Sequence, residues 1–223
     1  MKKPFVIAID GASSTGKSTL AKGLAKALGF AHVDSGAMYR GVTLYAQQND
    51  LLENKTLNTE VLLSQLDDIH LRFEGDTFWL NGVDVSTEIR SMQVSEAVSL
   101  VAAIPEVRAF LVAQQRIMGT NQPVIMDGRD IGTVVFPKAG LKLFLTADVN
   151  IRAQRRFDEL SAQNASTSVE EVRNNLAERD HLDSTRADSP LVQAADAVPL
   201  DATQFTVESM RDHVLDLVAE RLS

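Results

Sequence analysis

Residues 11–18, with the sequence GASSTGKS, have the residue types needed to hold a phosphate group. They match the pattern G-x-x-x-x-G-K-[ST], in which glycines let the backbone curl so that successive N–H groups point at one anion. Lys17 can reach β- and γ-phosphates, and the Ser18 hydroxyl can bind Mg²⁺. The alternative is a glycine- and serine-rich turn with a chance lysine. A strand before the segment and a helix after it favour phosphate binding.

Asp127 is the second candidate, because it follows the apolar run 124–126. Ligands of open α/β sheets bind at the carboxyl ends of the strands, where a carboxylate can hold Mg²⁺ directly or through water. An Asp that ends a strand is often only a turn residue or a helix cap. Together with the phosphate loop, Asp127 and Ser18 predict a Mg²⁺ site.

Arginines are the third feature, because a second phosphate group needs bidentate partners besides Lys17. Arg152 lies three and four residues before Arg155 and Arg156, so one helix face could present two of these cations. Any single arginine could instead form an exposed pair with a neighbouring acid. The candidates are Arg40, Arg108, Arg129, Arg152, Arg155, Arg156, Arg179 and Arg186.

No pattern of nucleophile and base competes with phosphate binding. The four histidines are far apart in the sequence and lack the spacing of metal ligands. We expect them to be structural or exposed; they are His32, His70, His181 and His213.

The composition limits the class of protein. The chain has 223 residues, a net charge of −8 and no cysteine, which excludes a disulfide framework and a cysteine nucleophile. The acidic balance disfavours a nucleic-acid binder that tracks phosphates, and aromatic residues at 5% are too few for a base-stacking platform. The first apolar run, residues 5–9, is too short for a secretory signal or a membrane span. We therefore expect a cytoplasmic protein that binds neither nucleic acid nor membrane, and we also expect a monomer.

The elements that must position these residues alternate between strands and helices. Helical spacing predicts helices from the phosphate loop to Gly29 and at residues 37–48, 105–118 and 207–222. Apolar runs predict buried strands at residues 5–9, 31–34, 124–126, 141–145 and 197–200. Strands separated by helices favour βαβ units and a parallel sheet.

Two segments interrupt this alternation. Residues 70–73, 77–80 and 83–85 predict short antiparallel strands, and Asn81-Gly82 is a strong hairpin signal because both residues accept a positive φ. Residues 151–186 are polar and rich in arginine, with a predicted loop at 164–167. The spacing of Ser168 and Glu171 predicts a capping box that begins a helix after this loop.

Four runs of residues resemble the bacterial cytidylate kinases, which are P-loop nucleoside monophosphate kinases. They are Asp10-Gly11, DSGAMYR at 34–40, DGRDIGTVVFP at 127–137 and RDHLDSTR at 179–186, and the resemblance extends nearly from end to end. The second and third runs are specific to this family. The resemblance implies an α/β P-loop kinase with a five-stranded parallel sheet flanked by helices, a small antiparallel insert and a helical lid. It implies one kinase domain over residues 1–223, with a monophosphate-binding insert at about 60–103 and the lid with its following helix at about 151–186.

The resemblance also implies a reaction, transfer of the γ-phosphate of ATP to CMP or dCMP with Mg²⁺, and a role for each site residue. Lys17 and Arg129 would be catalytic together with the lid cations Arg152, Arg155 and Arg156. ATP would contact Gly11, Ala12, Ser13, Ser14, Thr15, Gly16, Lys17, Ser18 and Thr19. The phosphate of CMP would contact Ser35, Arg40, Arg129 and Arg186; the cytosine edge, Ser99, Arg108 and Asp130; and the ribose hydroxyls, Arg179 and Asp183.

The phosphate loop departs from the family at one point. Ala12-Ser13-Ser14-Thr15 replaces the Pro-Ser-Gly-Ala/Ser that is often found there, so a glycine is lost. The backbone at Ser14 must still allow the loop to surround a phosphate.

Several other activities share a phosphate loop. A GTP-binding switch is disfavoured because Asn54-Lys55-Thr56-Leu57 lacks the acid of the guanine-binding Asn-Lys-x-Asp pattern. A kinase of another small acceptor, such as UMP, shikimate or dephospho-coenzyme A, is the nearer alternative, and the insert and residues 127–137 argue against it. A phosphate monoester has a second pKa of about 6 and is largely ionised at neutral pH, so its phosphorylation needs no general base.

Overall fold

The computed structural model describes residues 4–54, 56–162 and 167–222. The chain divides into two compact units. The first unit comprises Met1–Asp34 and Gln115–Ser223, and the second comprises Ser35–Gln114. The predicted insert at 60–103 lies within the second unit; its limits, and the assignment of one kinase domain to residues 1–223, stay predictions.

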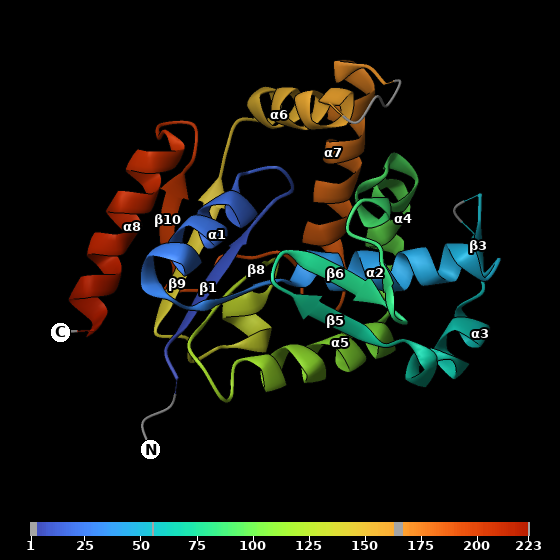
Figure 1. Ribbon diagram of the computed structural model, residues 1–223. Coiled ribbons are helices and arrows are strands. Elements are labelled where there is room, and N and C mark those ends of the chain that lie inside the picture. The colour runs from blue at the N-terminus through green and yellow to red at the C-terminus, as the bar shows by residue number, and fades with distance from the viewer. Residues whose placement is uncertain (1–3, 55, 163–166, 223) are drawn as a thin grey trace. The chain divides into compact units, whose positions relative to one another are not determined.

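A five-stranded parallel sheet forms the centre of the first unit (Figure 1). Its strands lie in the order β10-β9-β1-β8-β2, which confirms the predicted parallel sheet. Valine, isoleucine and leucine dominate these strands because helices or loops cover both faces of a parallel sheet. The bounds are β1 (Val6–Gly11), β2 (Ala31–Asp34), β8 (Val124–Gly128), β9 (Leu141–Thr146) and β10 (Val198–Asp201).

The register brings three of the predicted strand ends to one edge of the sheet. Asp34 lies opposite Asp127, and Asp10 lies opposite Gly128. The central strand β1 therefore ends beside the end of β8, which carries Asp127, and β2, which carries Asp34, is the next strand beyond β8. This is the edge at which open α/β sheets bind ligands.

Helices α1 (Lys17–Leu28) and α8 (Val207–Leu222) pack together against the sheet. Leu24 of α1 and Val214 of α8 share a buried cluster with Ile7, Ile9 and Leu143 of the strands. Gly29 ends α1 where the sequence predicted the end of this helix; with a φ of 67° it donates its N–H to the Ala25 carbonyl and forms a C-terminal cap.

Helices α6 (Val149–Ala162) and α7 (Val169–Thr185) pack side by side in the first unit. The predicted capping box is confirmed: the Glu171 N–H donates to Ser168 Oγ at 3.2 Å, and the Ser168 N–H donates to Glu171 Oε2 at 2.8 Å. Of the predicted loop at 164–167, residues 164–166 lie outside the described residues.

A π-helical turn, Ile131–Val135, follows β8 and was not predicted. The Phe136 N–H donates to the Ile131 carbonyl five residues earlier, at 2.7 Å. Arg116 donates to the carbonyls of Val134 at 2.8 Å and Val135 at 3.2 Å. Arg116 therefore provides hydrogen-bond donors for two carbonyls that have no acceptor role within this short turn.

The second unit packs helices with a three-stranded antiparallel sheet, as the sequence predicted. Asn81 and Gly82 have φ values of 49° and 82°, so the predicted hairpin turn is confirmed. Gly41, in the helix Ser35–Gln48, permits close packing of this helix against the Phe78 ring, because a Cβ atom there would lie 2.8 Å from that ring. The elements are α2 (Ser35–Gln48), β3 (Leu52–Glu53), β4 (Thr56–Leu57), α3 (Thr59–Ser64), β5 (Leu71–Glu74), β6 (Thr77–Leu80), β7 (Val83–Asp84), α4 (Met92–Ala102) and α5 (Pro105–Met118), which continues into the first unit.

Among the described residues, no helix has the length and apolar character to cross a membrane.

Candidate active site

The phosphate loop joins β1 to α1, so the predicted strand–loop–helix context is confirmed. Gly11 has a φ of 149°, and a Cβ atom there would collide with the backbone oxygen of Leu145. Gly16, with a φ of 95°, is the N-cap of α1 and offers no side-chain acceptor to the first helical N–H groups. No acidic residue occupies the first turn of α1. These N–H groups and the positive end of the helix dipole thus form an anion site.

Ser14 takes the backbone conformation that the lost glycine would adopt easily. Its φ is 59°, in the left-handed region, where a side chain costs about 1 kcal/mol. The loop therefore keeps its turn despite the substitution, as the sequence analysis required. The cost of the left-handed conformation is therefore a local backbone strain at Ser14.

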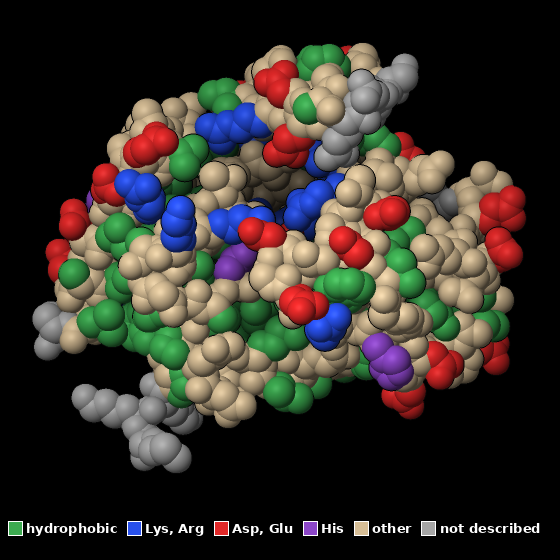
Figure 2. Space-filling view, in the orientation of Figure 1, with side chains coloured by type: hydrophobic (Ala, Val, Ile, Leu, Met, Phe, Trp, Pro, Cys, Tyr) green, Lys and Arg blue, Asp and Glu red, His purple; other side chains and the backbone are tan. Residues whose placement is uncertain are grey.

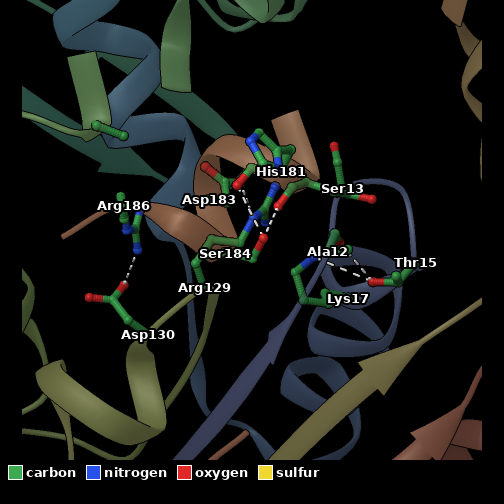
Figure 3. A network of polar contacts seen from close by, with 12 residues as sticks. Ala12, Ser13, Thr15, Lys17, Arg129, Asp130, His181, Asp183, Ser184 and Arg186 are labelled. Atoms are coloured by element: carbon green, nitrogen blue, oxygen red, sulfur yellow. Dashed lines mark hydrogen bonds and ion pairs between the residues drawn. The ribbon is translucent and has the colours of Figure 1, made fainter. Parts of the chain in front are cut away.

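Lys17 turns its side chain back onto its own loop (Figure 3). Nζ donates to the Ala12 carbonyl, and also to Thr15 Oγ1 at 3.4 Å. Burial, assisted by the nearby charge of Arg129, lowers the pKa of Lys17 from 10.5 to about 7. A phosphate anion in the loop is a better acceptor than a carbonyl, because it also favours the charged form of this amine.

Ser18 and Asp127, the predicted Mg²⁺ pair, contact each other. The Ser18 hydroxyl donates to Asp127 Oδ2 at 2.7 Å. A hydroxyl that donates its proton keeps two lone pairs for a cation, so this donor set fits Mg²⁺. No group of three or more acidic or histidine side chains able to hold a metal occurs among the described residues. Phosphate oxygens and water would therefore complete the coordination, as is usual for Mg²⁺.

His32 belongs to this cluster, although the sequence analysis assigned it no chemical role. Its Nε2 atom lies 2.7 Å from Asp127 Oδ1. The one signal in the sequence is that His32 lies two residues before Asp34 in a strand, so both point to the same face.

Asp10 joins the end of β1 to the π-helical turn, a role that the sequence analysis also missed. Its two carboxylate oxygens accept the N–H groups of Ile131 and Gly132, each at 2.7 Å. Burial raises the pKa of Asp10 to about 6, although both hydrogen bonds favour the ionised form. Asp10 thereby positions the residues that follow Arg129 and Asp130.

Two arginine–carboxylate pairs connect the end of β8 with α7 and the residue after it (Figure 3). Arg129 Nε donates to Asp183 Oδ2 at 2.8 Å, and Arg186 Nη2 lies 3.8 Å from Asp130 Oδ1. Burial alone would lower the pKa of Arg129, but Asp183 raises it above its ordinary value. Burial alone would likewise raise the pKa of Asp183, but Arg129 and Arg179 lower it. The fold thus brings five of the predicted CMP-binding residues together in the first unit.

The three predicted lid cations differ in their contacts. Arg152 donates from Nη1 to the Ser13 carbonyl at 3.2 Å and to Asp180 Oδ2 at 2.7 Å. Arg155 lies beside the loop, with Nη1 4.0 Å from the position of a Cβ atom on Gly16. Arg156 instead donates to Glu159 on its own helix, at 3.0 Å. Lys and Arg side chains occupy the surface over α1 and beneath α6 (Figure 2).

The remaining four candidates lie in the second unit. Ser35 and Arg40 belong to α2, and Ser99 is buried in α4. Arg108 of α5 is buried, with its guanidinium carbon 5.5 Å from the centre of the Tyr39 ring, and it donates to the Ala102 carbonyl at 3.2 Å. A cation against an aromatic face and a carbonyl is held in one orientation.

A model of the cytidylate kinase family matches residues 7–220. The chain belongs to the cytidylate kinase family. The cytidylate kinase of Flavobacterium psychrophilum is 51% identical to it over 97% of this chain and 98% of that protein. The cytidylate kinase of Porphyromonas gingivalis is 46% identical over 99% of this chain and 98% of that protein.

Family membership confirms the resemblance that the four sequence runs indicated. A solved structure of an uncharacterized protein from Eubacterium ventriosum is 11% identical, with a TM-score of 0.52, covering 98% of this chain and 99% of that chain. That likeness concerns the fold alone. The family match concerns the chain as a whole and assigns no role to single residues. The roles given to the site residues therefore stay predictions.

Proposed function

We propose that this member of the cytidylate kinase family transfers the γ-phosphoryl group of ATP to CMP or dCMP, giving ADP and CDP or dCDP. The observation that carries the proposal is the proximity, in the first unit, of two cationic side chains that we propose bind phosphate groups. Lys17 lies in the phosphate loop, and Arg129 is close enough to contribute to the low pKa of Lys17. A donor and an acceptor phosphate can therefore be held next to each other, which is the main difficulty in joining two anions.

ATP binds in the phosphate loop, residues 11–19. The N–H groups at the start of α1 and the charge of Lys17 stabilise the transferring phosphoryl group. An oxygen of the acceptor phosphate attacks the γ-phosphorus, and the bond from that phosphorus to the β,γ-bridging oxygen breaks. The acceptor oxygen is already ionised, so no residue has to remove a proton.

Mg²⁺ is proposed as the metal that accompanies ATP. Ser18 and Asp127 would hold it, through the hydroxyl lone pairs and the carboxylate, directly or through water. When bound, Mg²⁺ neutralises charge that develops on the phosphate oxygens.

Each proposed CMP contact keeps the role that the family resemblance implies for it. Arg129 and Arg186 of the first unit would bind the acceptor phosphate, because their acidic partners hold each guanidinium in place before CMP arrives. Asp130 would accept the cytosine amino group, and Arg179 and Asp183 would contact the ribose. In the second unit, the proposed phosphate ligands are Ser35 and Arg40, and the proposed cytosine contacts are Ser99 and Arg108.

The segment 151–186 is proposed as the lid, with Arg152, Arg155 and Arg156 as its catalytic cations. Closure over ATP would exclude water that could otherwise hydrolyse it. The hydrogen bond from Arg152 to the Ser13 carbonyl and the position of Arg155 beside Gly16 support this assignment. We further propose a cytoplasmic monomer that binds no nucleic acid. The lack of cysteine supports the compartment, and the net charge of −8 argues against a nucleic-acid partner.

A panel of acceptors tests the function. ADP formation is measured with CMP, dCMP, UMP, AMP, shikimate and dephospho-coenzyme A, and a Lys17→Ala preparation controls for contaminating kinases. CMP and dCMP should give the highest kcat/KM. A higher kcat/KM for any other acceptor would overturn the proposal.

The same panel tests the base contact. Asp130→Asn replaces an acceptor for the cytosine amino group by an amide, so discrimination between CMP and UMP should fall by about 1–3 kcal/mol. An equal loss of kcat/KM for both acceptors would instead show that Asp130 only orients Arg186.

A further inference from the structure

His32 lies on the strand next to β8 and on the same face as Asp127. In the parallel register of β2 and β8, His32 is opposite Ile125, and Asp34 is opposite Asp127. Residues two apart in a strand share a face, so the imidazole reaches diagonally to the next carboxylate along β8. Nε2 lies 2.7 Å from Asp127 Oδ1, and the side chains are 15% and 3% exposed.

This contact and the Ser18 contact hold different oxygens of one carboxylate. Because a carboxylate oxygen accepts hydrogen bonds, the tautomer of His32 with its proton on Nε2 donates to Oδ1. The Ser18 hydroxyl donates to Oδ2 at 2.7 Å. Donors from β2 and α1 therefore fix the plane of the Asp127 carboxylate, because rotation about its Cβ–Cγ bond would lengthen both hydrogen bonds.

The orientation of Asp127 determines the orientation of the Ser18 hydroxyl. With its proton on Oδ2, this hydroxyl directs its lone pairs away from Asp127 and toward other ligands. Without His32, the carboxylate could turn, and the hydroxyl would lose its fixed acceptor. Hydrogen bonds to a metal-binding group typically change metal affinity by about 10- to 100-fold when they are removed.

We propose that His32 is a positioning residue that orients Asp127, and through it Ser18, for the metal of Mg²⁺·ATP. This inference rests on the proposed function, since it takes Mg²⁺·ATP as the phosphoryl donor. His32 therefore affects the binding of ATP only when the metal is present, and it does not contact ATP.

The test compares ATP binding with and without the metal. Calorimetry measures the Kd of ATP in MgCl₂ and in EDTA for the parent, His32→Leu and His32→Gln. Leucine removes the donor, whereas the glutamine amide nitrogen has nearly the reach of Nε2. His213→Leu is the matched control, because His213 is an exposed residue of α8 that stacks on Phe205.

We expect His32→Leu to weaken Mg²⁺·ATP binding about tenfold or more, to leave metal-free ATP binding within about twofold, and His32→Gln to restore most of the loss. Unchanged Mg²⁺·ATP binding, or an equal loss with and without metal, would overturn the inference. If His32→Leu does not fold, His32→Asn replaces it, since its amide is one methylene shorter.

The parent enzyme separates this inference from the proposed function. Failure of the parent to phosphorylate CMP would refute the function. A parent that phosphorylates CMP, with His32→Leu binding Mg²⁺·ATP as the parent does, would refute the role of His32 alone.

Discussion

Lys17 illustrates how the phosphate loop is prepared for an anion. Its amine is buried against the Ala12 carbonyl and the Thr15 hydroxyl, where its charge is poorly solvated, and Arg129 adds repulsion. Nearby carboxylates of Asp127, Asp10 and Asp34 only partly compensate. The loop thus holds a cation whose charge an incoming phosphate stabilises.

Lys17 should take up a proton when ATP binds at pH 8. With a pKa of about 7, most of the amine is neutral at that pH without a ligand, and the phosphate anion raises the pKa again. Calorimetry of Mg²⁺·ATP binding in buffers of different ionisation enthalpy measures this uptake. Lys17→Met should abolish it and lower kcat by orders of magnitude. Binding heats at pH 8 that do not depend on the buffer would contradict the assignment.

At the scale of elements, arginine side chains connect the pair α6 and α7 to the phosphate loop and to the end of β8. Arg152 of α6 donates both to Asp180 of α7 and to the Ser13 carbonyl of the loop. Arg129 binds α7 through Asp183. A bound nucleotide would add negative charge next to these arginines, so it should change how firmly the two helices are held.

Hydrogen exchange in α6 and α7 should slow when ATP and CMP are both bound. The physical reason is that phosphate groups give the arginines of the segment a common partner, which suppresses local opening. Exchange measured by mass spectrometry, with peptides of α8 as the internal control, reports this change. Equal exchange of α6 and α7 with and without both nucleotides would show that the segment is no lid.

At the scale of the whole molecule, Asp10 couples folding to pH. Its carboxylate connects β1 with the π-helical turn, yet its burial raises its pKa from 3.8 to about 6. The folded state therefore binds more protons than the unfolded state between pH 4 and 6. The contribution of Asp10 to the free energy of unfolding is greatest below pH 4 and falls as pH rises through this window.

Asp10→Asn should remove this dependence. The free energy of urea unfolding is measured for parent and variant at pH 4.5 and 6.5, where Lys17 stays mostly charged. Relative to the variant, the parent should lose up to about 3 kcal/mol as pH rises across the full window, by the linkage of pKa to stability. A difference between parent and variant that stays constant with pH would refute the raised pKa of Asp10.

The sequence by itself determined the features that depend on neighbouring residues. Apolar runs and helical spacing predicted the five parallel strands and the main helices, because side-chain periodicity follows from backbone geometry. The phosphate loop, the Gly29 cap and the Ser168–Glu171 capping box are likewise local patterns, and the structure confirms each of them.

Only the tertiary structure decided which distant groups meet. Asp10 accepts from Ile131, 121 residues away, and His32 contacts Asp127, 95 residues away. These contacts depend on the order of strands in the sheet, and no spacing in the sequence encodes that order. The π-helical turn also depends on Arg116 at its carbonyls. Arg155 and Arg156 were equivalent in the sequence, whereas packing sets the rotation of α6 about its axis and places Arg155 beside Gly16.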